Sequence, residues 1–243
     1  MLKLSRRFRR LFTTFLVVTL IATSAYGLGW SNLLVVKKIS YSGVEAGSPQ
    51  ALQISTTIEG TGSNSIAVGD KLARLNLAGT SNKLAGISWI KEEKIARNWL
   101  KGTISVSITP RVPVAQFIDQ SGATKYLDGD GIEFLLPQSA NLPNSHLPNI
   151  SLNYSNNLTR KSAAKFVAAM PTAILESMTS LVISDSQIVS MTSGLRKPTL
   201  LIQWGQVSDL PNKIEVLNRL LALPENKKIS LVDLSDAASP VVK

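Results

Sequence analysis

The apolar and polar pattern begins with one long uncharged run near the N-terminal end of the chain. Residues Leu11–Trp30 read LFTTFLVVTLIATSAYGLGW, twenty residues without a charged side chain. As a helix this run spans about 30 Å, the thickness of the hydrocarbon core of a bilayer. The basic sequence RRFRR before the run is denser and closer to it than Lys37 and Lys38 after it. The positive-inside rule therefore predicts a cytoplasmic tail at 1–10, a transmembrane helix at 11–30 and an exported remainder.

A cleaved signal peptide is the alternative interpretation of the same run. Its end, ATSAYG, offers the small residues that a signal peptidase requires. The run is longer than the usual apolar region of about 7–15 residues in a signal peptide, which favours an uncleaved anchor. Both interpretations place the bulk of the protein outside the cytoplasm.

The next part of the chain predicts a small mixed unit. A short β-rich segment, Val35–Tyr41, is closed by Gly43, and Ser48 with Pro49 is typical of the start of a helix. A second helix is expected after a cap at Thr80, carrying Leu84 and Ile87. After ISWI, the charged segment KEEKIARNW is typical of a strand with one solvated face, and ISVSIT alternates as a half-buried strand does. The predicted order is β-α-α-β-β, with two helices on one face of a three-stranded sheet.

The second half of the chain predicts another α+β unit around a larger, mostly antiparallel sheet. A helix is expected at Leu158–Met178 with a kink at Pro171, and another after Pro211. The turn of the sequence DGDG is expected to join two short strands. The predicted strands are Val114–Asp119, Lys125–Leu127, Ile132–Leu136, Leu181–Ser184, Ile188–Thr192, Thr199–Trp204, Lys228–Leu234 and, after a turn at Asp236, Ala237–Val242.

Composition narrows the classes of function. The formal net charge is +10, but five of the basic residues lie within the first ten positions, and the others form no stripe with interleaved aromatic residues. A nucleic-acid surface would concentrate Lys and Arg on one element, so this class is not favoured. The chain has no cysteine, which excludes disulfides, thiolate metal sites and cysteine nucleophiles.

Motifs that would indicate catalysis or a cofactor are weak throughout the chain. The single histidine, His146, lies in a polar loop, and Glu92 and Glu93 are adjacent on a strand and so face opposite sides. The DGDG turn lacks the further ligands of a calcium loop, and GTGSNS lacks the lysine of a phosphate-binding loop. We therefore expect no enzyme activity, no cofactor and no metal. A membrane-anchored serine–lysine hydrolase is the enzyme that stays open, because two such residues leave little trace in a sequence.

Several segments, in order along nearly the whole chain, resemble the bacterial cell division family FtsQ/DivIB. They are VKKISYSG after the anchor, ISWIKEEKIARNW, ISVSITPRVPVAQF, YLDGDGIEF, LPNI, WG with a following helix, and VDLSDAASPVVK. The resemblance implies a POTRA domain at 35–112 and an FtsQ-type β domain at 113–243. It departs from the family where Pro110 replaces an acidic residue before Arg111, and where Leu100-Lys101-Gly102 replaces a proline after the tryptophan.

The resemblance further implies a single-pass divisome scaffold in the cytoplasmic membrane, concentrated at the septum. Such a protein links early and late division proteins, and it influences septal peptidoglycan synthesis by binding an FtsB/FtsL-like pair. Other divisome proteins are expected to bind the POTRA domain, where Arg97 and Arg111 are candidate contacts or simply satisfied surface residues. The last strand is the implied partner-binding site, with a frayed tail as the alternative. Its candidate residues are Ser235, Asp236, Ala237, Ala238, Ser239, Pro240, Val241 and Val242.

Two prolines punctuate the passage between the predicted domains. Proline lacks the N–H that a β-ladder requires and fixes its own φ angle. Residues Pro110, Arg111, Val112 and Pro113 are therefore predicted to form a short, stiff hinge. A POTRA-containing protein of another envelope assembly or export system is the further alternative; an outer-membrane type would continue into a barrel of many strands of about ten residues.

Overall fold

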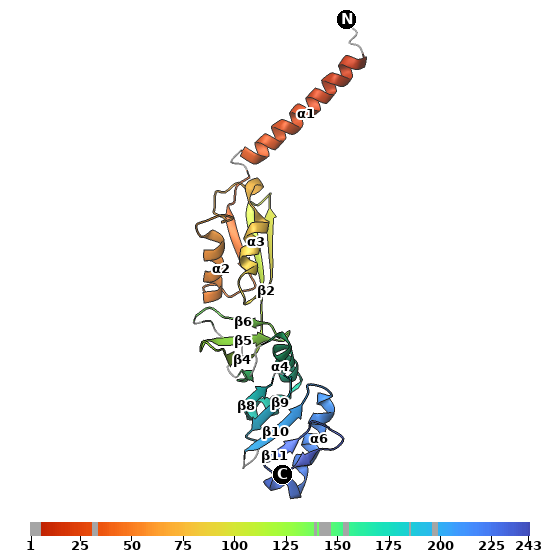
Figure 1. The fold of residues 1–243 in the computed structure, drawn as a ribbon. Helices are drawn as coiled ribbons and strands as arrows, with labels where there is room; N and C mark the ends of the chain where they lie inside the picture. Colours follow the sequence, from red (N-terminus) through yellow and green to blue (C-terminus); the bar gives the residue numbers. More distant parts are fainter. Residues whose placement is uncertain are drawn as a thin grey trace. The chain divides into compact units, whose positions relative to one another are not determined.

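The structure, a computed structural model, describes residues 6–30, 34–138, 140, 147–152, 156–184, 186–195 and 199–243. The chain divides into two compact units, Met1–Pro110 and Arg111–Lys243 (Figure 1). The mixed α+β fold class predicted from the sequence is confirmed, with an N-terminal apolar helix, a small β-α-α-β sheet region and a six-stranded mixed sheet.

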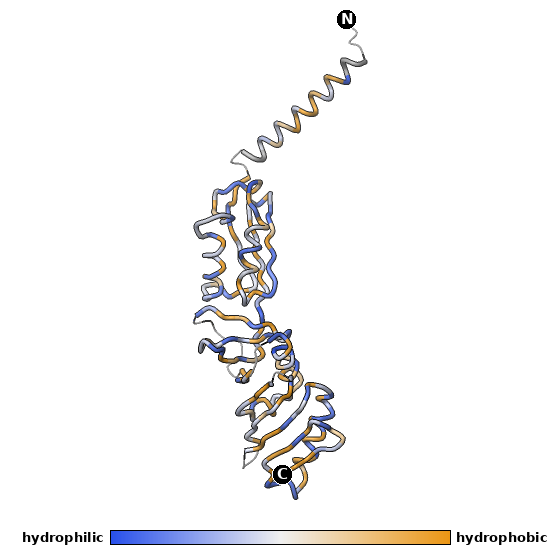
Figure 2. Tube along the Cα trace, in the orientation of Figure 1, coloured by the Kyte–Doolittle hydropathy of each residue, from blue (hydrophilic) through white to orange (hydrophobic). Residues whose placement is uncertain are grey.

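Helix α1, Arg6–Trp30, contains the segment Arg10–Gly27, whose mean hydropathy of 1.3 and length suffice to cross a membrane. Apolar residues recur along most of this helix (Figure 2). The hydroxyl groups of Thr13 and Thr14 donate to the carbonyl of Arg10, each at 2.9 Å, so they carry no unsatisfied donor into an apolar surrounding. The helix is consistent with a single-pass membrane anchor.

The first unit contains a three-stranded sheet in the order β1-β3-β2. Strand β1, Lys38–Ser42, runs parallel to β3, Thr103–Pro110, which is antiparallel to β2, Ile90–Asn98. The inward side chains of β3 are buried and the serines between them are exposed, as the alternation predicts. The remaining elements of this unit are the helices α2 (Pro49–Glu59) and α3 (Leu77–Ala85) and the short 3₁₀ helix η1 (Leu72–Arg74).

Three details of the first unit differ from the expectation. Helix α3 ends at Ala85, so Ile87 lies outside it. Strand β1 begins three residues later than predicted, because Val35 forms only an isolated bridge with Lys71. The cap of α3 is Asn76, whose side chain accepts from the N–H of Gly79 at 3.0 Å, and not Thr80. Thr80 lies inside the helix, fully buried, where its hydroxyl donates to the carbonyl of Asn64 at 2.8 Å. From the sequence alone, a threonine inside a helix that bonds a neighbouring loop cannot be distinguished from a threonine that caps the helix.

The second unit contains two sheets of different size. The first, ordered β4-β5-β6, is antiparallel, and the second, ordered β12-β11-β10-β9-β8-β7, is mixed because β7 with β8 and β10 with β11 pair in parallel. The strands are β4 (Pro113–Ile118), β5 (Thr124–Asp128), β6 (Glu133–Phe134), β7 (Ser151–Leu152), β8 (Met178–Ile183), β9 (Val189–Ser193), β10 (Leu200–Gly205), β11 (Leu231–Asp233) and β12 (Val241–Val242).

Main-chain bonds connect these two sheets through Gln116 of β4. Its N–H donates to the carbonyl of Pro148 at 3.0 Å, and its carbonyl accepts from the N–H of Ile150 at 2.9 Å. The segment that contains Ile150 leads directly into β7 at the border of the larger sheet. The strands of the second unit therefore form one nearly continuous array. Strand β7 was not predicted from the sequence, because a strand of two residues carries no periodicity.

The helices of the second unit are α4 (Asn157–Ala169), α5 (Thr172–Ser177), α6 (Leu210–Ala222) and the short 3₁₀ helix η2 (Pro224–Lys228). Pro171 ends one helix and begins the next instead of kinking a single long one, because it cannot donate within a helix. Among the fully buried side chains, the rings of Phe166 and Trp204 meet edge to face at 5.4 Å. This core supports the six-stranded sheet and hence the position of its last strand.

Candidate functional site

The predicted partner-binding residues surround β12, the first strand in the order of the six-stranded sheet. Within the described residues, β11 is the strand that pairs with β12, so the opposite edge of β12 is open. Val241 lies opposite Asp233, and Val242 lies opposite Val232. Lys243 extends the pairing, because its N–H and carbonyl both bond to Leu231 at 3.0 Å.

The pairing decides which main-chain groups of β12 point outward. In an antiparallel pair, residues that exchange both bonds alternate with residues whose N–H and C=O face away. Since Lys243 exchanges both bonds with Leu231, Val242 occupies the outward-facing register, and so does Pro240. The N–H that proline lacks would have pointed to the open edge, so Pro240 costs the sheet no internal bond. The open edge thus presents the N–H and C=O of Val242 and the C=O of Pro240.

Aspartates shape the turn between β11 and β12. Asp233 Oδ1 accepts from the N–H of Ser235, and Asp236 Oδ1 accepts from the N–H of Ala238, each at 2.9 Å. These bonds within the turn replace ladder bonds, so the predicted strand Ala237–Val242 is wrong over its first four residues, and β12 comprises Val241–Val242. The tail nevertheless pairs with β11 as far as Lys243.

Gly205 at the end of β10 allows the last turn to pack closely. Its φ angle is +66°, a conformation that glycine adopts readily, and a Cβ at this position would lie 2.8 Å from Cα of Ser235. Leu234 donates its N–H to the carbonyl of Gln203 at 2.7 Å. The glycine of the WG sequence therefore leaves the space that the turn before β12 occupies.

Lys213 of α6 is a structural residue of this site that the sequence pattern did not reveal. It is 3% exposed, and its Nζ donates to the carbonyls of Trp204 at 2.6 Å and Gln206 at 3.0 Å. Burial lowers the pKa of Lys213, and the carboxylates of Asp209, Asp233 and Asp236 partly oppose this shift. Its spacing in the sequence could have indicated that Lys213 is buried, because it lies three residues after Leu210 and four before Leu217, on the buried face of α6.

The arrangement at β12 is suited to recognition by an added strand. An extended peptide would pair with the outward groups of Val242 and Pro240, and main-chain bonds would supply affinity. Val241 is 48% exposed, whereas Val242 is partly buried against the core. The edge therefore offers a partner an apolar side chain beside its unpaired main-chain groups.

The predicted hinge residues lie where the two units meet along the sequence. Pro110 is the last residue of β3 and pairs with Ile90, and Pro113 is the first residue of β4. Arg111 forms an ion pair with Asp128. The other oxygen of Asp128 accepts from the N–H of Asp130 at 3.0 Å and of Ile132 at 2.8 Å, which holds the DGDG sequence in a turn.

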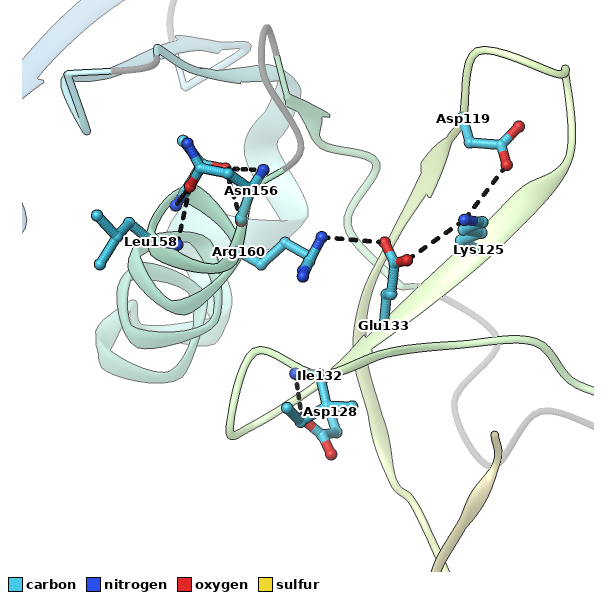
Figure 3. A network of polar contacts seen from close by, with 9 residues as sticks. Asp119, Lys125, Asp128, Ile132, Glu133, Asn156, Leu158 and Arg160 are labelled. Carbon is cyan, nitrogen blue, oxygen red and sulfur yellow. Dashed lines mark hydrogen bonds and ion pairs between the residues drawn. The ribbon is translucent and has the colours of Figure 1, made fainter. Parts of the chain in front are cut away.

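A chain of ion pairs joins the β4–β5 turn, β5, β6 and α4 of the second unit (Figure 3). Arg160 contacts Glu133 at 3.3 Å, and Lys125 lies 3.4 Å from both Glu133 and Asp119. Hydrogen bonds from Ser121, and to a lesser extent from Ala123, lower the pKa of Asp119 to about 2. This network is part of the internal structure of the unit.

The other residues singled out from the sequence have structural contacts or lie outside the described residues. Arg97 donates to the carbonyls of Leu72 at 2.6 Å and Leu75 at 3.1 Å. His146 lies outside the described residues. Among the residues that the structure describes, no group of three or more His, Asp or Glu could hold a metal ion.

These observations define a class: a two-unit α+β protein with an apolar N-terminal helix and an open strand at its C-terminal sheet edge. The chain is similar to a protein named cell division protein FtsQ from Salinibacter ruber (strain DSM 13855 / M31). The two are 28% identical over 126 residues, which cover 51% of this chain and 46% of that relative. The match therefore spans about half the length of each. This distant similarity confirms the resemblance stated from the sequence, and no family model matches the chain.

Proposed function

We propose that the protein is a non-catalytic, single-pass scaffold of bacterial cell division. Helix α1 holds it in the cytoplasmic membrane, with the N-terminus in the cytoplasm and both compact units outside, at the septum. The similarity to a protein named cell division protein FtsQ supports this proposal, as does the length and hydropathy of α1. The first unit would act as the POTRA domain and the second as the FtsQ-type β domain.

The proposed activity is binding of an FtsB/FtsL-like pair at Ser235–Val242, which would influence septal peptidoglycan synthesis. The observation that carries this proposal is the open edge of β12, with the N–H and C=O of Val242 directed outward. Other divisome proteins would bind the first unit. The residues Pro110–Pro113 would act as a stiff connection between the two binding modules, since both prolines restrict φ.

A pair of proline variants provides the sharpest test of strand addition. Val242→Pro removes an outward N–H, so the ladder with β11 stays complete, whereas Val241→Pro removes an inward N–H and damages the ladder. Losing one main-chain bond costs about 1 kcal/mol, and obstruction by the ring adds to this, so we expect affinity for the FtsB/FtsL-like pair to fall about tenfold or more in Val242→Pro.

The readouts are partner affinity, from titration in detergent, and the denaturant midpoint of unfolding. The control Val242→Ala keeps the N–H and should retain most of the affinity. If Val242→Pro leaves both the partner affinity and the unfolding midpoint unchanged, the proposal that the partner adds a strand to β12 is wrong. Truncation after Leu234 tests the same proposal by removing all of the proposed binding residues. Affinity that is unchanged in a truncated chain that remains folded would contradict the proposal.

The cellular role has its own test. Depletion of the protein in its native bacterium should stop division and produce filaments, as seen by microscopy. Cells that continue to divide at normal length would exclude a role in division whatever the result for β12.

A further inference from the structure

Exposed apolar and basic side chains gather at one end of the three-stranded sheet. Because β1 and β3 are parallel, the start of β1 lies beside the start of β3 and the β2–β3 hairpin that precedes it. At the tip of this hairpin Trp99 is 43% exposed and Leu100 is 96% exposed. Val68, in the neighbouring loop, is 67% exposed. Single exposed apolar residues are ordinary, but a group of them beside lysines indicates a contact surface.

The hairpin tip is held firmly against the start of β1. The carbonyl of Gly102 accepts from the N–H of Lys37 at 2.7 Å. Gly102 has a φ angle of +65°, and a Cβ there would lie 2.7 Å from the carbonyl oxygen of Val35. On the other side of the hairpin, the guanidinium of Arg97 lies 5.3 Å from the centre of the Trp99 ring and also bonds the carbonyl of Leu72. These contacts fix the tip in its exposed position.

The length of the chain places this tip within reach of a membrane that α1 spans. Helix α1 ends at Trp30, and Val35, which contacts the tip, follows five residues later. Five extended residues span at most about 18 Å. The loop of Val68 lies beside the same segment, because Gly69 donates its N–H to the carbonyl of Val36 at 2.8 Å. The surface is therefore tethered near the bilayer in any arrangement of the helix and the unit.

The charges around the tip complement anionic lipid. Lys37, Lys38, Arg74 and Lys101 are exposed at this end of the sheet. Asp70 is an acidic neighbour, and its carboxylate accepts from the N–H of Ala67 at 2.7 Å. A lysine or arginine near an anionic membrane surface contributes about 1 kcal/mol, and tryptophan favours the interface because its ring is apolar and its N–H is polar.

We propose that this surface is a second membrane contact of the protein, in addition to α1. Trp99, Leu100 and Val68 insert into the headgroup layer of the leaflet in which α1 ends, and the surrounding lysines bind lipid phosphates. The inference rests on the proposed anchoring of the chain by α1. It requires no partner protein.

The test uses the full chain, which has no cysteine, so one introduced cysteine gives one labelled position. Leu100→Cys carries an environment-sensitive nitrobenzoxadiazole label in vesicles of phosphatidylcholine and phosphatidylglycerol that contain lipids with a nitroxide near the headgroup. The matched control is Leu52→Cys, 59% exposed in the first turn of α2, which follows the other end of β1. We expect a blue shift and loss of emission by quenching for the label at 100, and neither for the label at 52.

Flotation of the vesicles separates the two proposals. Protein that floats with the vesicles while the label at 100 behaves like the label at 52 overturns the second contact and leaves the anchor. Protein that does not float overturns both.

Charge variants test the role of the lipid phosphates. Each of Lys37→Gln, Lys38→Gln and Lys101→Gln should lower the ratio of docked to undocked tip about fivefold, as measured by quenching of the label at 100. Lys94→Gln, exposed within β2, is the control and should change little. Equal quenching in all variants and in pure phosphatidylcholine would overturn the assignment of lysines to lipid phosphates.

Discussion

The two units differ in how they build an open sheet edge. In the first unit β2 is an edge strand of nine residues, and Lys91, Glu92 and Lys94 on it are exposed. In the second unit β12 has two residues, both valine. Charged side chains, lysine above all, discourage the pairing of an edge with another chain. The two edges thus differ in strand length and in charge, and the charges on β2 are the feature that is expected to discourage pairing with another chain.

Removing the charges of β2 should have the largest effect, because it converts a protected edge into an open one nine residues long. In the variant Lys91→Val, Glu92→Val, Lys94→Val we expect a change from monomer to oligomers or aggregates, measured by sedimentation velocity in detergent. The matched variant with glutamine at the same three positions should aggregate less. A monomeric valine variant would show that these charges do not protect β2.

The cations that bind backbone carbonyls give the second comparison. Lys213 of the second unit is almost fully buried, whereas Arg97 of the first unit is partly exposed, and each donates to two carbonyls. Removing a donor from buried carbonyls costs about 1–3 kcal/mol each, partly offset when the cost of burying the charge disappears. We expect Lys213→Met to lower the free energy of unfolding by about 2 kcal/mol and Arg97→Met by about 1 kcal/mol, measured with denaturant.

The pH dependence of stability provides an independent check on Lys213. Its pKa is lowered in the folded state from the ordinary 10.5, so in the interval between the two values the unfolded chain binds more protons. Stability contributed by this group therefore rises with pH across that interval, and the rise should be missing in Lys213→Met. An unchanged alkaline profile in the variant would contradict burial of the ammonium group.

A lysine on β12 would make this edge resemble β2. Val241→Lys places a charge at a half-exposed position, so we expect about a tenfold loss of affinity for the FtsB/FtsL-like pair and a change in unfolding free energy within about 0.5 kcal/mol. Val241→Thr is the uncharged control. Equal affinity for both variants would show that charge at this position does not govern partner binding.

The smallest effect is expected at the hairpin turns. Asp119 in the β4–β5 turn accepts from Ser121 and Ala123. Asn98, the last residue of β2, accepts from the N–H of Lys101 in the β2–β3 turn and does not titrate. Because the pKa of Asp119 is lowered to about 2 from 3.8, its stabilisation is complete above the higher value and is lost as pH falls through the lower one. In thermal unfolding at decreasing pH, the unfolding temperature of the unmodified protein should fall slightly more than that of Asp119→Asn. Identical pH profiles for the two proteins would contradict the stabilising role of the Asp119 carboxylate.

Long periodic segments were predicted well because their pattern repeats several times. The helix at the N-terminus, the helix after Pro49 and the alternation of Ile104 to Ile108 were each visible in the sequence. Short elements were predicted less well. Strand β7, with two residues, was missed, and β12 was predicted too long because the Asp236 turn shortens it. The open edge of β12 follows from the sheet order, which brings β11 beside β10 and leaves β12 outermost.

By itself the sequence determined the apolar helix, the α+β class and the resemblance to a division protein, because these depend on local periodicity and on motif order. Only the tertiary structure decided that Val242 faces the open edge and that Lys213 binds the end of β10. The first depends on the register between β11 and β12, and the second on how α6 approaches β10. It likewise brought the Trp99–Leu100 tip beside the start of β1. Contacts of this kind have no periodic signature in the chain.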